Sequence, residues 1–199
     1  STLGSMLIAS SGEILTFLAA WLFLLASLYF LIYQHSPETA RSFLILQAVS
    51  ILLFILGVSL IYGISGSTVF SEIKTNLVLS FFRVGPPGLV FSLAMVLIIT
   101  SLAIQLELFP FHIGMLGLQS KLPTPLVAYF SISIKLSFLV FFLRFFIRAF
   151  AIYQPEWVNI LAFLVGGSLL YGSLMLFKKN KLEKLLSYFI LFQSGLLVL

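Results

Sequence analysis

The chain of 199 residues is 61% hydrophobic and only 9% charged. A soluble domain carries about 25% charged residues, so this composition excludes a water-soluble fold and predicts an integral membrane protein. The net charge of +5 is spread between apolar runs, and we therefore expect no nucleic-acid partner. With two histidines and no cysteine, a zinc or iron–sulfur centre held by this chain is not expected.

Long uncharged runs predict an all-α polytopic bundle of about six full transmembrane helices, with a partial helix at the start in residues 3–11. Strands are not expected, because an open sheet edge cannot face lipid. The segments between the runs, including residues 63–76, are interpreted as short links. The expected full spans are residues 14–34, 42–62, 87–108, 124–143, 157–177 and 185–199.

Pro110 comes just after the third full span, residues 87–108, and either ends it or breaks the helix in two. Proline breaks a helix because it lacks an N–H and clashes with the preceding turn, so we expect two half-helices that meet near Pro110. Glu107 lies just before this break and His112 just after it. His112 titrates near neutrality and is a candidate for proton transfer, with capping of the broken helix as the alternative.

Lys135 interrupts the fourth full span. It lies about 18 Å along a helix from Pro123, near the middle of a hydrocarbon core of about 30 Å. A lysine there costs about 2.5–3.5 kcal/mol on an insertion scale, which makes it a functional-site candidate. It is either a proton relay or a packing lysine paired with a carboxylate, and Glu107 is either that partner or an interfacial carboxylate in water. The expected polar neighbours of Lys135 are Glu107, Gln105, Ser131 and Ser133.

Basic residues are slightly unequal between the two predicted sides of the membrane. One side carries residues 34–41, Lys121 and the lysine-rich segment 178–184; the other carries Lys74, Arg83, Arg144 and Arg148. The first side holds more lysine and arginine, which predicts that it faces the cytoplasm or a mitochondrial matrix. We interpret the 178–184 segment as an anchor and the two arginines as snorkelling residues.

The stretches ELFPFHIG (residues 107–114) and LPTPLVAYFSISIK (residues 122–135) resemble the signature of the antiporter-like subunits of respiratory complex I. Residues 38–68 and 168–195 resemble further segments of that family, and most closely of its subunit 2 type. The similar segments occur in family order over nearly the whole chain. Each similarity is modest, and the ordered series is specific.

The resemblance implies that residues 1–199 form a single transmembrane domain, corresponding to the middle part, about helices four to ten, of the antiporter-like inverted-repeat fold (compare). It places Lys135 at the family's eighth-helix lysine. Other ionisable family positions are replaced, a glutamate by Leu22, two lysines by Gln105 and Glu183, and a histidine by Gln193. Leucine and glutamine cannot change charge. The resemblance therefore predicts reduced or lost proton transfer, unless a break near Pro110 lets Glu107 take the place of Gln105.

The resemblance further implies a membrane-arm subunit of NADH:ubiquinone oxidoreductase that contributes to the proton-translocating module. Such a subunit is part of an enzyme but has no active centre of its own and binds no cofactor. NADH, flavin, iron–sulfur clusters and ubiquinone would belong to other subunits. The alternatives are a free-standing cation/proton antiporter fragment and a purely structural membrane subunit of another assembly.

The expected partners are other membrane-arm subunits, including a chain that supplies the missing helices, and inner-membrane lipids. The expected location is the mitochondrial inner membrane, crossed several times, with a bacterial plasma membrane as the alternative.

Overall fold

The computed structural model describes residues 1–84, 88–119, 121–178 and 182–198, and for some helical residues the backbone alone. The regular elements of the described part are all helices, as expected, and its one pairing of extended backbone is an isolated antiparallel bridge between Glu13 and Val69. The helices are α1 (Thr2–Ser10), α2 (Ile14–Tyr33), α3 (Pro37–Ser65), α4 (Phe70–Val84), α5 (Leu89–Gln105), α6 (His112–Gln119), α7 (Thr124–Tyr129), a π-helix (Phe130–Ile134), α8 (Lys135–Ala149), a 3₁₀ turn (Ala151–Tyr153), α9 (Gln154–Lys178) and α10 (Leu182–Val198).

Helix α3 shows how local sequence sets the ends of the helices. Ser36 is its N-cap, and the hydroxyl of Ser36 accepts a hydrogen bond from the backbone N–H of Thr39. Pro37 occupies the first helical position, where its missing N–H costs nothing. The helix ends at Ser65, and Gly66 caps it in the left-handed conformation, with a φ of 69° that glycine tolerates without a Cβ clash.

Four helical segments in the described part are long and apolar enough to cross a membrane: α2, α3, the continuous α7–α8 segment, and most of α9. Helix α5 and the Tyr188–Val198 part of α10 are apolar but shorter. The expected six spans are therefore four full-length helices and two shorter ones. The partial helix at the start is confirmed as α1.

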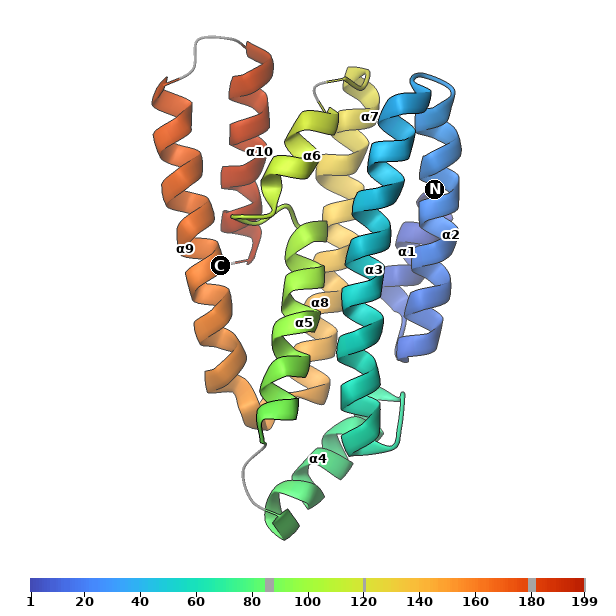
Figure 1. Cartoon of the computed structure of the whole chain (residues 1–199), viewed down its shortest axis with the longest axis vertical. Coiled ribbons are helices and arrows are strands. Elements are labelled where there is room, and N and C mark those ends of the chain that lie inside the picture. The colour runs from blue at the N-terminus through green and yellow to red at the C-terminus, as the bar shows by residue number, and fades with distance from the viewer. Residues whose placement is uncertain (85–87, 120, 179–181, 199) are drawn as a thin grey trace.

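One expected link is a helix. Residues 63–76 were interpreted as a connection, but α4 begins at Phe70 and continues to Val84. Its apolar residues Phe70, Ile73 and Leu77 are buried, at three- and four-residue spacing, while its other face is exposed. A run-length criterion does not detect such a helix, because its polar face breaks the apolar run. Figure 1 shows α4 lying obliquely across one end of the bundle.

Helices α3 and α5 lie side by side in the centre of the bundle, and α9 packs with α10 beside them (Figure 1). The α3–α5 contact needs glycine at position 57, because a Cβ there would lie 2.6 Å from Cγ1 of Ile98 and 3.0 Å from the carbonyl oxygen of Ala94. Small residues allow such close approach of membrane helices.

Phenylalanine fills the core between α2, α3, α4 and α8. Phe17 of α2 stacks on Phe141 of α8 with ring centroids 3.4 Å apart, and it also contacts Phe54 and Phe138. Aromatic pairs of this kind contribute about 0.5–1.5 kcal/mol each beyond the area that they bury. This rigid apolar core fixes α8, and α8 carries Lys135.

The two sides expected from the sequence correspond to the two ends of the bundle. The α2–α3 turn and the facing ends of α9 and α10 lie at one end, and α4 and the α8–α9 junction lie at the other (Figure 1). The side chains of the lysine-rich segment 178–184 lie outside the described part of the structure. Arg144 donates a hydrogen bond of 2.6 Å to the carbonyl oxygen of Ala9, where α1 ends, so it has a structural partner beyond simple snorkelling.

Candidate functional site

The third full span breaks where the sequence predicts. Helix α5 ends at Gln105, and α6 begins at His112 after an irregular segment that contains Pro110. The backbone N–H of Leu108 donates to the carbonyl oxygen of Ala103, five residues back, so the last turn of α5 is widened before the chain leaves the helix. The expectation of two half-helices is confirmed.

Glu107 lies in this break with a φ of 56°, a left-handed conformation that is uncommon for a residue other than glycine. Such a conformation costs about 1–3 kcal/mol, and residues held in it cluster at functional sites. Two residues along a straight helix correspond to a rotation of about 200°, so an unbroken α5 would point Glu107 away from the direction of Gln105. The break frees Glu107 from this helical orientation, and the side chains of Gln105 and Glu107 are both buried.

Helix α9 supports the broken segment. Phe109 lies in the irregular segment after α5, and its backbone N–H donates a hydrogen bond of 2.8 Å to the hydroxyl of Ser168. The ring of Phe109 lies against Gly167, where a Cβ would be 2.8 Å from a ring carbon. A glycine and a serine side by side on α9 thus hold the backbone that positions Glu107.

Lys135 is the first residue of α8, directly after the π-helix, and is 2% exposed. Its Nζ lies 2.7 Å from Oε2 of Glu107 in a fully buried ion pair. The same Nζ donates a hydrogen bond of 2.6 Å to Oγ of Ser194, and Ser194 donates in turn to the carbonyl oxygen of Ile190 on α10. Single π-turns within helices often occur at functional sites. The break, α8 and α10 therefore meet at one charged centre inside the bundle.

The expectation for the neighbours of Lys135 is partly confirmed. Glu107 is the partner, as one of the two interpretations proposed. Gln105 and Ser131 bond elsewhere, Ser131 to the carbonyl oxygen of Val127. Ser194 was not expected. Its one sequence signal was its position next to Gln193, which the family resemblance had already marked.

Gln105 belongs to a neutral polar cluster on α2, α3 and α5. It exchanges two amide hydrogen bonds of 2.8 and 3.2 Å with Gln47 and donates a third to Ser50. Trp21 donates its indole N–H to Gln47, and Ser50 pairs with Ser101. We call these five residues the amide cluster. All five are buried. Their side chains are amides, hydroxyls and an indole, so none of them can change its charge at a physiological pH.

A small cavity of about 10 Å³ lies between the two clusters and is lined by Gln47, Gln105 and Glu107 together with apolar side chains. A cavity of about 10–15 Å³ is the least that holds one water molecule. The ion pair and the amide cluster are therefore separate in chemistry but adjacent in space.

The described contacts of the remaining candidate residues do not include Lys135. His112 is 1% exposed, and its described contacts are aromatic, with ring centroids 5.8 Å from Phe109 and 4.9 Å from Tyr171. Leu22 is 55% exposed on α2, whereas its neighbour Trp21 faces the amide cluster. Gln193 is half-buried on α10. The backbone of Glu183 is in α10, and its side chain lies outside the described part.

Metal binding has no support in the described residues. Among them, no group of three histidine, aspartate or glutamate side chains lies close enough together to hold an ion.

These features define a class: a multi-pass helical membrane protein with a broken span and a lysine–glutamate pair buried at the break. The chain belongs to the family described as NADH:quinone oxidoreductase/Mrp antiporter transmembrane proteins, whose profile matches residues 11–199.

Its relatives include NAD(P)H-quinone oxidoreductase subunit 2 of Prochlorococcus marinus strain NATL2A, 26% identical over 100% of this chain and 38% of the relative. NADH-quinone oxidoreductase subunit N of Pelagibacter ubique is 30% identical over 94% of this chain and 40% of the relative. The chain thus spans about two fifths of the length of these relatives.

Two solved structures are similar in fold. A chain of respiratory complex I from Thermus thermophilus with bound aureothin superimposes with a TM-score of 0.76 and 27% identity, over 97% of this chain and 41% of the other. A chain of the Mrp complex from Dietzia sp. DQ12-45-1b superimposes with a TM-score of 0.83, 16% identity and coverage of 98% and 36%, which shows the fold alone.

Proposed function

We propose that this chain is part of a membrane-arm subunit of an NADH:quinone oxidoreductase and contributes a proton-carrying site to its proton-translocating module. The family match and the relatives named NADH-quinone oxidoreductase subunits support the assignment. The observation that carries the proton-handling part is the buried 2.7 Å contact between Lys135 and Glu107 at the helix break.

The chemistry of this pair suits proton transfer. A proton can pass directly from the ammonium of Lys135 to the carboxylate of Glu107, which converts a charged pair into a neutral one. Both forms are tolerated inside an apolar bundle, whereas a single buried charge without a partner is not. The hydroxyl of Ser194 accepts a hydrogen bond from Lys135 and keeps the amine in place. A change at the irregular segment 106–111 would alter the separation of the two groups and hence the direction in which the proton moves.

A scaffold without proton transfer is the second candidate, and the amide cluster favours it. In the family register Gln105 stands at a lysine position, and here it is bonded to Gln47 and Ser50 rather than to an ionisable group. Among the described residues that line the small cavity, protons would then have no titratable group to reach beyond Glu107. The two candidates differ in whether replacing Glu107 alters proton translocation.

We propose that the redox chemistry of such a complex takes place on other subunits. NADH, flavin, iron–sulfur clusters and ubiquinone would be bound there, and this chain would have no active centre of its own. Its lack of cysteine supports this for iron–sulfur clusters, which are held mainly by cysteine thiolates.

The proposed partners are other membrane-arm subunits, including a polypeptide that supplies the remaining helices of the fold. The similar solved structures come from multi-subunit assemblies, which supports such partners. The proposed membrane is the mitochondrial inner membrane. A bacterial plasma membrane is the alternative, and the bacterial origin of the relatives supports it.

Blue-native electrophoresis of membranes that carry the epitope-tagged chain tests this assignment. We expect the tag to co-migrate with a large complex that stains for NADH dehydrogenase activity in the gel. Migration as a free monomer, separate from that activity, would favour the free-standing antiporter. Co-migration with a large complex that lacks the activity would favour a structural subunit of another assembly.

A further inference from the structure

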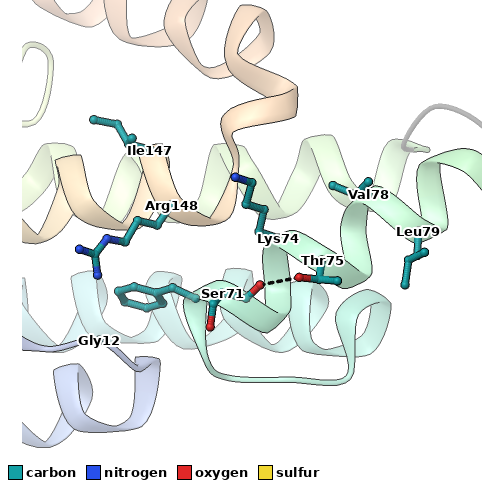
Figure 2. Close-up of a pocket in the computed structure, with 9 residues that line it drawn as sticks. Gly12, Ser71, Lys74, Thr75, Val78, Leu79, Ile147 and Arg148 are labelled. Atoms are coloured by element: carbon teal, nitrogen blue, oxygen red, sulfur yellow. Dashed lines mark hydrogen bonds between the residues drawn. The ribbon is translucent and has the colours of Figure 1, made fainter.

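The described part of the chain has an open hollow of about 770 Å³ at the end of the bundle where α4 lies. Residues of α4, the last turns of α8 and Gly12 from the α1–α2 connection line it (Figure 2). Arg148 on its wall is thirteen residues after Lys135, about 20 Å along a helix. The hollow is therefore remote from the ion pair and has no part in the proposed proton transfer.

Two cations line the hollow from different helices. Lys74 extends from α4 and Arg148 from α8, and both are exposed (Figure 2). Neither has an ion pair or hydrogen bond with another described side chain. The described acid of α4, Glu72, accepts a hydrogen bond from Ser67 instead of facing them. The site is thus positively charged and open.

Apolar side chains form much of the rest of the wall, together with the hydroxyl side chains of Ser71 and Thr75. Val78, Leu79 and Ile147 line it, and Leu79 and Ile147 are 48% and 59% exposed. Arg148 lies next to Ala149, the last residue of a span long enough to cross the membrane. Helix α4 buries one apolar face and exposes a face with Ser71, Lys74 and Thr75, as helices at a membrane interface do. Cations at headgroup depth beside apolar residues match one class of ligand, a phospholipid.

We propose that this hollow binds an anionic phospholipid. Lys74 and Arg148 contact the phosphate, the lysine as a point charge and the arginine through its planar fork of donors. One acyl chain runs along Val78, Leu79 and Ile147. A zwitterionic lipid binds more weakly, because the positive group of its headgroup is repelled by Lys74 and Arg148.

Photo-crosslinking of the chain in its native assembly tests the proposal. Benzoylphenylalanine replaces Leu79 on the rim, the membranes are irradiated, and the mass of each adduct identifies its source. We expect lipid adducts enriched in phosphatidylglycerol or cardiolipin relative to their share of the membrane. Lys74→Gln and Arg148→Gln should each lower this enriched adduct about fivefold, the factor that corresponds to about 1 kcal/mol per cation at a membrane surface.

The matched control is Arg41→Gln, which removes an exposed cation at the opposite end of the bundle and should leave the yield unchanged. Lys74→Arg keeps the charge and should keep the adduct. A polypeptide adduct, a lipid adduct in bulk proportions, or a yield insensitive to Lys74 and Arg148 would overturn the proposal.

Discussion

Two buried polar clusters lie next to each other in this bundle, and only one of them contains groups that change protonation state. The Lys135–Glu107 pair is built on a broken helix, a π-turn and a serine of α10. The amide cluster is built on continuous turns of α2, α3 and α5. The difference shows what the break provides: an irregular backbone frees Glu107 from the helical direction that Gln105 keeps.

The two clusters also differ in the free energy that it costs to bury them. A neutral network is tolerated in an apolar core when each buried polar group has a partner, as the Gln47–Gln105 exchange provides. A buried ion pair needs both partners, because either one alone leaves an uncompensated charge. We therefore expect substitutions at the pair to reduce stability more than substitutions in the amide cluster.

The largest effect is expected for Lys135→Met. It leaves the carboxylate of Glu107 buried without its cation, and breaking a buried pair in this way costs about 3–5 kcal/mol. We expect a much lower level of assembled protein and a lower thermal unfolding midpoint in detergent. Lys121→Met, an exposed lysine, is the control and should change stability by less than about 0.5 kcal/mol. Equal stability of the two variants would contradict the buried pair.

A smaller effect is expected for Gln105→Leu. The variant leaves the Gln47 amide with fewer partners and removes a donor to Ser50, a loss of about 1–3 kcal/mol. Gln47→Leu should cost a similar amount, and the double variant less than the sum, because the two amides mainly satisfy each other. A double-mutant cycle of thermal unfolding measures this coupling. Strict additivity would show that the two amides do not act as a pair.

Much of this comparison could be predicted from the sequence. The apolar runs predicted the helices, Pro110 predicted the break, and the charge in mid-span predicted a buried Lys135 with Glu107 as an available partner. These features follow from local rules about helix length, proline and buried charge, so they need no knowledge of the packing.

Other features depend on packing between distant segments. Ser194 lies 59 residues from Lys135, and no local pattern marks one serine of a membrane helix as a ligand for a lysine. The Gln47–Gln105 pairing spans 58 residues for the same reason. Helix α4 was missed because its exposed polar face interrupts the apolar run. Which side of α2 faces inward was also open, and the structure turns Trp21 rather than Leu22 to the core.

Ser194→Ala should have a modest effect. Lys135 loses one hydrogen-bond acceptor but keeps Glu107, so we expect a loss of about 1 kcal/mol in stability. Ser173→Ala on α9 is the matched control, since in the described part of the chain that serine bonds within its own helix, to the carbonyl oxygen of Leu170. A loss at Ser194 no larger than at Ser173 would show that the 2.6 Å contact contributes nothing.

The smallest effect is expected for Leu22→Ala. Leu22 is exposed on α2, so truncation should change stability by less than about 0.5 kcal/mol, although the family resemblance aligns this position with an ionisable one. Thermal unfolding of the isolated chain and of the assembly measures it. A large loss in the assembly alone would identify Leu22 as an interface residue.

The proton-carrying role of the pair is tested most directly by Glu107→Gln in sealed vesicles that contain the intact complex. Glutamine keeps the size and an acceptor oxygen for Lys135 but cannot take up a proton. With assembly confirmed by native electrophoresis and Leu22→Ala as the control, we predict a lower proton-to-electron ratio during NADH oxidation for Glu107→Gln only. An unchanged ratio in the assembled variant would contradict proton transfer through Lys135 and Glu107 and would establish the scaffold instead.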